Sequence, residues 1–199
     1  MDESQFKVIL LGEMGVGKTS LSNVALGRGI TPAHATIQAC FADLHCKVGR
    51  DTSVCLQIWD TAGQERYRSL APMYFRHARA IVGCYDMSDP VNTIKALHIW
   101  IENCAQTLQG IPLFIVGTKS DLVSSSADDT HSMKKNDSTS PPMVLDQDDN
   151  CFDWEPFTAA WENVFELHWH CTSAKNNEGV RWGLFADIAS VCHRDKVFQ

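Results

Sequence analysis

Long apolar runs, C-x-x-C pairs and an excess of basic residues are all missing from this chain of 199 residues. No apolar run approaches the roughly 20 residues of a membrane-spanning helix, and the acidic start MDESQ resembles neither a signal nor a transit peptide. The eight cysteines are therefore expected to be reduced thiols in a cytoplasmic protein. A net charge of −7 argues against general nucleic-acid binding.

The stretch GEMGVGKTS, residues 12–20, fits the phosphate-binding pattern G-x-x-x-x-G-K-[ST]. The apolar run Phe6–Leu11 precedes it and the helix-competent segment Thr19–Leu26 follows it, which is the strand–loop–helix context that the pattern requires. Glycines in such a loop let backbone N–H groups approach phosphate oxygens, while the lysine reaches the β- and γ-phosphates and the hydroxyl of Thr19 ligates Mg²⁺. A plain glycine-rich turn is the alternative. We expect a nucleoside polyphosphate to bind here.

Strand and helix signals alternate along the chain, which predicts a mainly parallel sheet with helices on both faces. Two β-rich runs, Ala39–Val48 and Ser53–Asp60, flank a Gly-Arg-Asp turn and predict a hairpin, so that one strand is antiparallel and lies at the sheet edge. The other expected strands are Phe6–Leu11, Ala80–Tyr85, Ile111–Val116 and His168–Cys171. Helical patterns cover Thr19–Leu26, Val91–Leu108, Trp154–Leu167 and Val180–Val191. We predict one α/β domain over residues 1–199, with six strands and five helices.

A second polar motif, DTAGQE, begins at Asp60 directly after the strand LQIW. An acid at the end of a strand beside the glycine-rich loop suits a water-mediated contact to Mg²⁺. Gly63 offers its N–H to a γ-phosphate without a side chain in the way, and Gln64 is placed to orient an attacking water. The pattern alone also fits a simple turn, but its position after the neighbouring strand favours the phosphate site.

Two further motifs, TKSD ending at Asp121 and TSAK ending at Lys175, each follow an expected strand. Ligands of open α/β sheets bind at the carboxyl ends of strands. Asp121 can accept hydrogen bonds from the N1 and N2 donors of guanine, and adenine offers no such donor pair. The stems of Lys119 and Lys175 can cover the purine faces, and the N–H of Ala174 can donate to O6. Each tetrad alone fits a polar loop, whereas the two in this order favour a guanine site.

Together these motifs resemble those of small GTPases of the Ras superfamily, and within it the Rab family. The resemblance covers residues 6–122 and 168–191 approximately. WDTAGQERYRSLAPMYFR, which starts at Trp59, is similar to the second switch of Rab proteins. ATIQACF, which starts at Ala35, and SLAPMY resemble switch segments of the Rab branch that works on early endosomes. The resemblance implies a P-loop NTPase fold of the small-GTPase type.

The resemblance also implies roles for individual residues. Thr36 supplies the first-switch hydroxyl that completes Mg²⁺ coordination, and Phe41, Trp59 and Tyr74 form the aromatic triad that Rab proteins show to effectors; ordinary packing is the alternative for the triad. We expect GTP or GDP with Mg²⁺, and an exchange factor, a GTPase-activating protein and effectors at the switches. The expected nucleotide-binding residues are Gly12, Gly15, Val16, Gly17, Lys18, Thr19, Ser20, Thr36, Gly63, Thr118, Lys119, Asp121, Ser173, Ala174 and Lys175. The expected metal-site residues are Thr19, Thr36 and, through water, Asp60, and the expected catalytic residues are Gln64 and Lys18.

Four features depart from the family pattern. Thr118 stands where most of the superfamily has Asn, although Rac-like members also carry Thr, so we expect guanine selectivity with lower affinity. Met14 stands where Ras has Gly and can crowd the transition state or an arginine finger, so the sequence supports nucleotide binding more strongly than hydrolysis. Gln38 replaces a common Gly of the first switch and can change partner choice. No lipidation signal follows Cys192, so this is either a form without the prenylated tail or one recruited to membranes by a partner.

Residues 124–155 form an acidic, Ser- and Asp-rich insertion, longer than the corresponding stretch of ordinary Rab proteins. Their net charge is −6, which leaves −1 for the rest of the chain, and no helical or strand period is visible through Asp149. We expect a long surface loop within a single GTPase domain. It is either a tolerated, solvated insertion or a partner-binding or phosphorylated element.

Two clusters in the C-terminal part also have alternative interpretations. His168, His170 and Cys171 suggest a metal site, although alternating histidines on a short strand also fit simple packing. The four tryptophans expected to form a satellite core beneath the inserted loop are Trp154, Trp161, Trp169 and Trp182.

The sequence therefore predicts a monomeric Rab-like GTPase, a slow GTP hydrolase that acts as a switch in vesicle and endosomal membrane traffic. We expect it in the cytoplasm, with membrane contact absent or through a partner. One alternative is a nucleotide-binding interaction module with little turnover, which Met14 motivates. A P-loop ATPase or kinase is another, and the guanine-type TKSD and TSAK motifs disfavour it.

Overall fold

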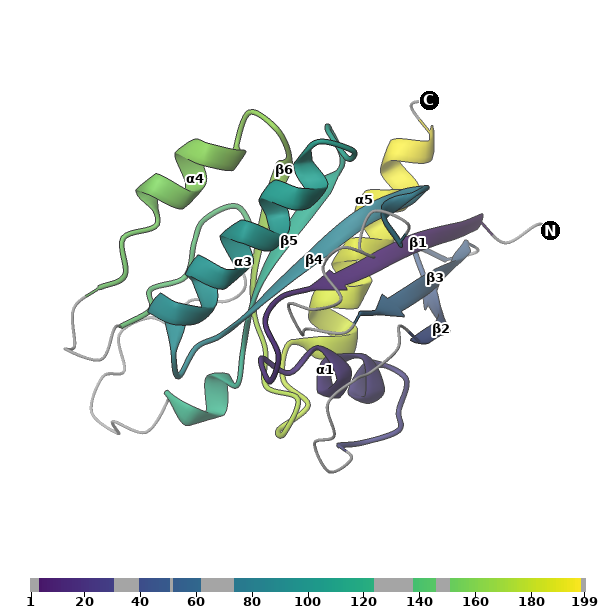
Figure 1. The fold of residues 1–199 in the computed structure, drawn as a ribbon. Helices are drawn as coiled ribbons and strands as arrows, with labels where there is room; N and C mark the ends of the chain where they lie inside the picture. The colour runs from purple at the N-terminus through teal and green to yellow at the C-terminus, as the bar shows by residue number, and fades with distance from the viewer. Residues whose placement is uncertain are drawn as a thin grey trace.

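A computed structural model describes residues 4–30, 40–50, 52–61, 74–123, 138–145 and 151–197, which form a six-stranded sheet with helices on both faces (Figure 1). The strands are β1 (Ser4–Leu11), β2 (Cys40–Lys47), β3 (Ser53–Asp60), β4 (Ala78–Asp86), β5 (Pro112–Thr118) and β6 (Glu166–Cys171). The α-helices are α1 (Lys18–Ala25), α3 (Pro90–Ala105), α4 (Glu155–Trp161) and α5 (Ala186–Val197). The predicted α/β fold with six strands is confirmed.

The strand order is β2-β3-β1-β4-β5-β6, and only the pair β2–β3 is antiparallel. The connection between these two strands turns at Gly49, whose φ of +107° suits a residue without a side chain. The N–H of Val48 donates to the carbonyl of Thr52 at 2.8 Å and closes the turn. The predicted hairpin and its antiparallel edge strand are therefore confirmed.

The predicted count of five helices is wrong, because the described part of the chain holds four α-helices. Only four segments of the sequence carry a helical pattern of apolar residues, and each of them contains an α-helix in the structure. The remaining helical pieces are short: a 3₁₀ turn, η2 (Ser120–Leu122), and a π-helical segment, η3 (Val180–Phe185), that runs directly into α5. The predicted helix Trp154–Leu167 is also shorter in the structure, because β6 already begins at Glu166.

The sheet separates two apolar layers, as the alternation of side chains along β1 illustrates. Val8 and Leu10 point toward the layer that contains α1 and α5, and Ile9 and Leu11 point toward the layer that contains α3 and α4. All four side chains are fully buried, because a central parallel strand is covered on both faces. Figure 1 shows α3 in front of the sheet and α5 behind it. This arrangement brings the carboxyl ends of β1, β4, β5 and β6 to one edge of the sheet.

Part of the acidic insertion packs against the sheet, whereas we expected a long surface loop. Residues 138–145 and 151–154, here named the return segment, lie beside the outer edge of β6, where the N–H of Trp169 donates to the carbonyl of Ser138 at 3.0 Å. Val144 is only 3% exposed, and its carbonyl accepts from the N–H of Phe152 at 2.7 Å. An edge strand leaves backbone groups unpaired, so a chain segment that covers it is stabilised there. Residues 124–137 and 146–150 lie outside the described ranges.

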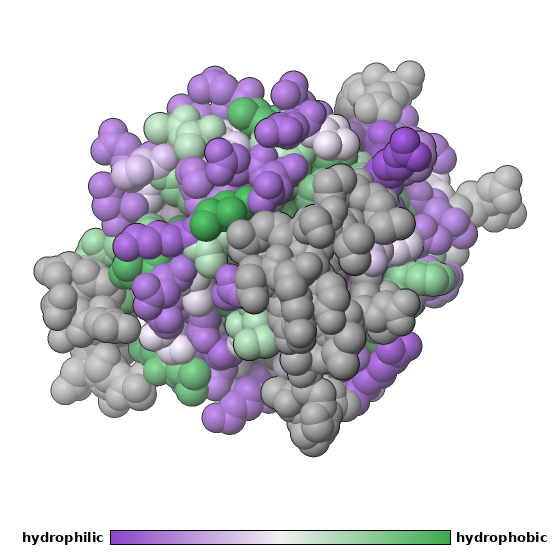
Figure 2. Space-filling view, in the orientation of Figure 1, coloured by the Kyte–Doolittle hydropathy of each residue, from purple (hydrophilic) through white to green (hydrophobic). Residues whose placement is uncertain are grey.

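Three of the four tryptophans expected to form a satellite core do so. Trp154, Trp161 and Trp169 are buried in the layer that contains α3 and α4. Trp182 is 85% exposed, so the prediction is wrong for this residue. It lies on η3, where Val180 and Leu184 turn inward to the opposite apolar layer. On the face seen in Figure 2, hydrophobic residues are scattered among hydrophilic ones.

Candidate functional site

The glycine-rich loop between β1 and α1 has the conformation that its glycines permit. Gly12, Gly15 and Gly17 have φ angles of +139°, +83° and +101°, which side-chain-bearing residues rarely adopt. A Cβ on Gly12 would also lie 2.4 Å from the carbonyl oxygen of Cys84 on β4. The loop is therefore held close to the sheet edge, with α1 beginning directly after Gly17. A helix N-terminus and a turning backbone at one point are suited to an anion.

Lys18 lies under this loop and is tied to it through its ammonium group. Nζ donates to the carbonyl of Gly12 at 2.9 Å and to that of Glu13 at 2.7 Å. Only 5% of the residue is exposed, and this burial lowers the pKa of Lys18 while the charges of Asp60 and Glu13 oppose the shift. The result is a buried cation held at the loop by carbonyl oxygens, which a phosphate can attract.

Thr19 and Asp60 meet beside Lys18 and offer oxygen atoms to a cation. The hydroxyl of Thr19 donates to Oδ2 of Asp60 at 2.7 Å. Oδ1 of Asp60 is buried and has no hydrogen-bond partner among the described residues. Burial raises the pKa of Asp60, against the hydrogen bond from Thr19 and the charge of Lys18. Mg²⁺ binds oxygen atoms and usually retains waters and phosphate oxygens, so this donor set fits it.

The TKSD and TSAK motifs meet through Asp121 and Ser173. The hydroxyl of Ser173, which is fully buried, donates to Oδ1 of Asp121 at 2.6 Å, and Nζ of Lys175 lies 3.6 Å from Oδ2. The Ser173 hydroxyl is the main cause that lowers the pKa of Asp121. Ser173 also accepts from the N–H of Asn176 at 3.1 Å. An ionised carboxylate is thus oriented at the ends of β5 and β6.

Thr118 links the glycine-rich loop to two strands. Its hydroxyl lies 2.5 Å from the carbonyl oxygen of Val16 and 2.9 Å from that of Tyr85, and the residue is 4% exposed. A hydroxyl has one proton to donate, so these two acceptors share it. The sequence suggested a nucleotide contact at this position, and the observed contacts of the Thr118 hydroxyl are with the protein backbone.

Lys119 forms an ion pair that the sequence did not predict. Its backbone is left-handed, with φ of 57°, and its Nζ lies 2.5 Å from Oδ2 of Asp86 at the end of β4. Burial would raise the pKa of Asp86, but hydrogen bonds from Lys119 and Ser88 outweigh it and lower that pKa. The signal for Asp86 was present in the sequence, because it directly follows the apolar run AIVGCY as a polar strand end.

The structure thus gathers the described residues of the predicted site at one edge of the sheet. They come from the loop after β1, the end of β3, the loop after β5 and the loop after β6. Three predicted site residues, Thr36, Gly63 and Gln64, lie outside the described ranges. Met14 has a half-exposed side chain, and its N–H donates to Oε1 of Glu13 at 3.0 Å.

The three aromatic residues predicted to face effectors are neighbours at the β2–β3 edge. The rings of Phe41 and Trp59 stack with centroids 5.4 Å apart, and Tyr74 lies 6.1 Å from Trp59 in a tilted arrangement. Phe41 is 62% exposed, so it is not an ordinary core residue. Nζ of Lys7 lies 4.1 Å from the centroid of the Trp59 ring and adds a cation–π contact.

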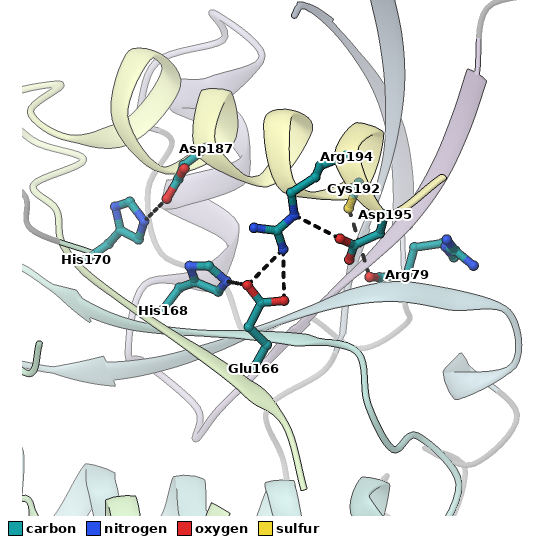
Figure 3. A network of polar contacts seen from close by, with 8 residues as sticks. All are labelled: Arg79, Glu166, His168, His170, Asp187, Cys192, Arg194 and Asp195. Atoms are coloured by element: carbon teal, nitrogen blue, oxygen red, sulfur yellow. Dashed lines mark hydrogen bonds and ion pairs between the residues drawn. The ribbon is translucent and has the colours of Figure 1, made fainter. Parts of the chain in front are cut away.

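The histidines of β6 belong to a network of polar contacts with α5 (Figure 3). His170 lies 3.0 Å from Asp187, and His168 lies 3.1 Å from Glu166, which also binds Arg194 through both carboxylate oxygens. Across the described ranges, no group of three His, Cys, Asp or Glu side chains could hold a metal ion. The contacts of this network join β6 to α5. In the same ranges, no helix is both long and apolar enough to cross a bilayer.

Comparison with known proteins agrees with this geometry. Residues 7–193 match the family model of the Ras family. The chain is 43% identical to the Ras-like GTP-binding protein RYL2 of Yarrowia lipolytica over 125 residues, and this alignment covers 62% of this chain and 59% of the relative. It is 42% identical over 118 residues to the ras-related protein Rab-5B of Dictyostelium discoideum (59% of this chain, 54% of the relative). It is 41% identical over 118 residues to the GTP-binding protein ypt5 of Schizosaccharomyces pombe (58% and 56%). The matches span little more than half the length of these relatives.

Proposed function

The chain belongs to the Ras family and is of the Rab type, and from this we propose that it is a guanine-nucleotide switch. It binds GTP and GDP with Mg²⁺ and hydrolyses GTP slowly. The observation that supports this most is the hydrogen bond between Ser173 and Asp121, because it orients a guanine-type acceptor at the sheet edge that also carries the glycine-rich loop. A phosphate site and a guanine acceptor at one edge are what GTP requires.

The proposed chemistry consists mainly of positioning and charge stabilisation. Lys18 exchanges its two carbonyl acceptors for phosphate oxygens, and backbone N–H groups of the loop bind the remaining phosphate charge. Thr19, Thr36 and Asp60 would hold Mg²⁺, with Asp60 acting through water. The bound ion would neutralise charge on the β- and γ-phosphates. Gln64 orients the attacking water, a role that rests on the DTAGQE motif.

The proposed switch depends on contacts that only the γ-phosphate provides. Thr36 and the N–H of Gly63 bind GTP, and hydrolysis removes their partner, which changes the surface offered to effectors. Phe41, Trp59 and Tyr74 are the proposed effector contacts, supported by the stacking and the exposure of Phe41. We also propose that residues 1–199 form a single GTPase domain with an acidic insertion at 124–155. The proposed protein is a cytoplasmic monomer that acts in vesicle or endosomal membrane traffic, with membrane contact either absent or made through a partner.

Nucleotide titration and single-turnover hydrolysis test the proposal. Fluorescence titration should give tight binding of GDP and GTP and weak binding of ADP, whereas a preference for ADP would contradict the guanine site. GTP hydrolysis should be slower in Gln64→Leu than in the wild-type protein. Equal rates in these two proteins would remove the role of Gln64 while leaving the binding proposal intact.

A second candidate function is a nucleotide-binding interaction module with little turnover. Met14 supports it, since a half-exposed side chain stands on the loop where Ras has Gly, and the N–H of Met14 donates to the Glu13 carboxylate. The variant Met14→Gly separates the two candidates. Faster GTP hydrolysis in Met14→Gly than in the wild-type protein supports the second candidate, because the methionine then suppresses turnover.

A further inference from the structure

The return segment ends at Trp154, which packs directly on a core tyrosine. The ring centroids of Trp154 and Tyr85 are 5.4 Å apart and their planes meet at 67°, an edge-on contact. Trp154 is 7% exposed and Tyr85 is fully buried. The indole Nε1 of Trp154 donates to the carbonyl of Pro142 at 2.9 Å, so the position of this ring depends on the inserted residues.

Tyr85 in turn packs against the strand that leads into TKSD. A Cβ on Gly117 would lie 2.8 Å from the Tyr85 hydroxyl oxygen, so the phenol ring ends against the bare backbone of Gly117. That hydroxyl is buried and has no hydrogen-bond partner among the described residues, and packing alone therefore sets its position. The carbonyl of Tyr85 lies within hydrogen-bond distance of the Thr118 hydroxyl, at 2.9 Å.

Gly117 is the point at which the two base-side loops are joined. Its carbonyl accepts from the backbone N–H of Thr172 at 2.7 Å and from the Thr172 hydroxyl at 3.1 Å. The carbonyl of Thr172 accepts from the N–H of Ser120 at 3.1 Å. A displacement of Gly117 is thus passed to both TKSD and TSAK, because backbone hydrogen bonds connect them.

We propose that Trp154 and Tyr85 are positioning residues of the guanine-binding loops, through which the return segment of the acidic insertion sets the rate of nucleotide release. The inference rests on the proposed function. The buried side chain of Tyr85 contacts Trp154 of the return segment on one side and the backbone of Gly117 on the other. A partner that draws the return segment off β6 would therefore loosen the base side of the site. On the phosphate side, Lys18, Thr19 and Asp60 make contacts that involve neither Trp154 nor Tyr85.

The test compares two tryptophans of the same apolar layer. Trp154→Leu removes the aromatic contact with Tyr85 while retaining much of the apolar volume, and Trp161→Leu loosens the same layer where Trp161 packs on Phe165 and His98. Release of a fluorescent GDP derivative should be roughly 2- to 30-fold faster in Trp154→Leu and unchanged in Trp161→Leu. Single-turnover GTP hydrolysis should change in neither, because the γ-phosphate lies on the other side of the site. The exposed Trp182→Leu variant controls for the loss of a tryptophan.

Equal acceleration in the two buried variants, or wild-type release in Trp154→Leu, would overturn the inference. If Trp154→Leu does not fold, Trp154→Phe and Trp161→Phe replace the pair, and the expected acceleration is at the lower end of the range. Failure of the proposed function looks different, since the wild-type protein then binds no GDP derivative. In that case, amide hydrogen exchange of residues 113–123 tests whether Trp154 is coupled to the loop after β5. Faster exchange in Trp154→Leu than in Trp161→Leu supports the coupling, and equal exchange refutes it.

Discussion

Replacing Thr118 by valine removes a single hydroxyl from the junction between the glycine-rich loop and the strands. Valine has the same shape, so no cavity forms, but the carbonyls of Val16 and Tyr85 lose the proton that they share. Thr118 is only 4% exposed, and water does not replace the hydroxyl without a movement of the chain. Leaving one buried acceptor unpaired costs about 1–3 kcal/mol.

This cost should appear mainly in nucleotide affinity. In the free protein the loop can turn the Val16 carbonyl toward water, whereas bound phosphates hold the loop N–H groups and prevent that relaxation. If the whole cost falls on the bound state, the affinity for GDP decreases by about 5- to 150-fold. Thr118→Ser keeps the hydroxyl and should stay near the wild-type affinity.

Fluorescence titration of GDP into the wild-type protein, Thr118→Val and Thr118→Ser measures this effect, and urea unfolding without nucleotide measures any loss of stability. A dissociation constant for GDP in Thr118→Val within twofold of the wild-type constant would refute the reasoning. So would a serine variant as weak as the valine variant, because the hydroxyl would then not be the cause.

Three further predictions follow from the same site. Gly12→Ala should destabilise the fold by about 1–3 kcal/mol from its positive φ alone, and by more through overlap with the Cys84 carbonyl. Gly15 has open space around it, so Gly15→Ala should lose less stability in urea unfolding, and equal losses in the two variants would contradict the overlap. Asp121→Asn should lower GDP affinity by about 10- to 150-fold and favour a xanthine nucleotide, because the C2 oxygen of xanthine accepts a hydrogen bond where the amino group of guanine donates one. Competition titration measures both effects, and an unchanged preference for guanine would argue against the base contact. Burial raises the pKa of Cys84 to about 12, so iodoacetamide at pH 8 should alkylate exposed Cys151 and spare Cys84, and mass-spectrometric labelling of Cys84 in the folded protein would contradict this.

The chemistry-bearing loops could be predicted because each is encoded locally. The glycines that allow positive φ, Lys18 and the hydroxyl of Thr19 are consecutive in the chain between a strand and a helix. Asp121 and Ser173 each follow an apolar run, and carboxyl ends of parallel strands meet at one sheet edge whatever joins them. The fold class and the antiparallel edge strand follow from the same local signals.

The remaining features depend on which distant surfaces meet, and local patterns do not carry that information. Trp154 and Trp182 look alike in the sequence, but one lies against Tyr85 and the other is exposed on η3. The ion pair of Lys119 with Asp86 requires the ends of β4 and β5 to be neighbours.

The sequence by itself determined the α/β fold class and the Ras-family membership, and it predicted a phosphate-binding loop, a guanine-type carboxylate and a Rab-like switch segment, because short motifs fix backbone conformation and chemistry together. Only the tertiary structure decided that part of the acidic insertion returns to the sheet. Val144 and Trp154 are buried there because the uncovered edge of β6 and the apolar layer around Trp169 accept them. Burial of this kind arises from the order of strands in the sheet, which no local segment specifies.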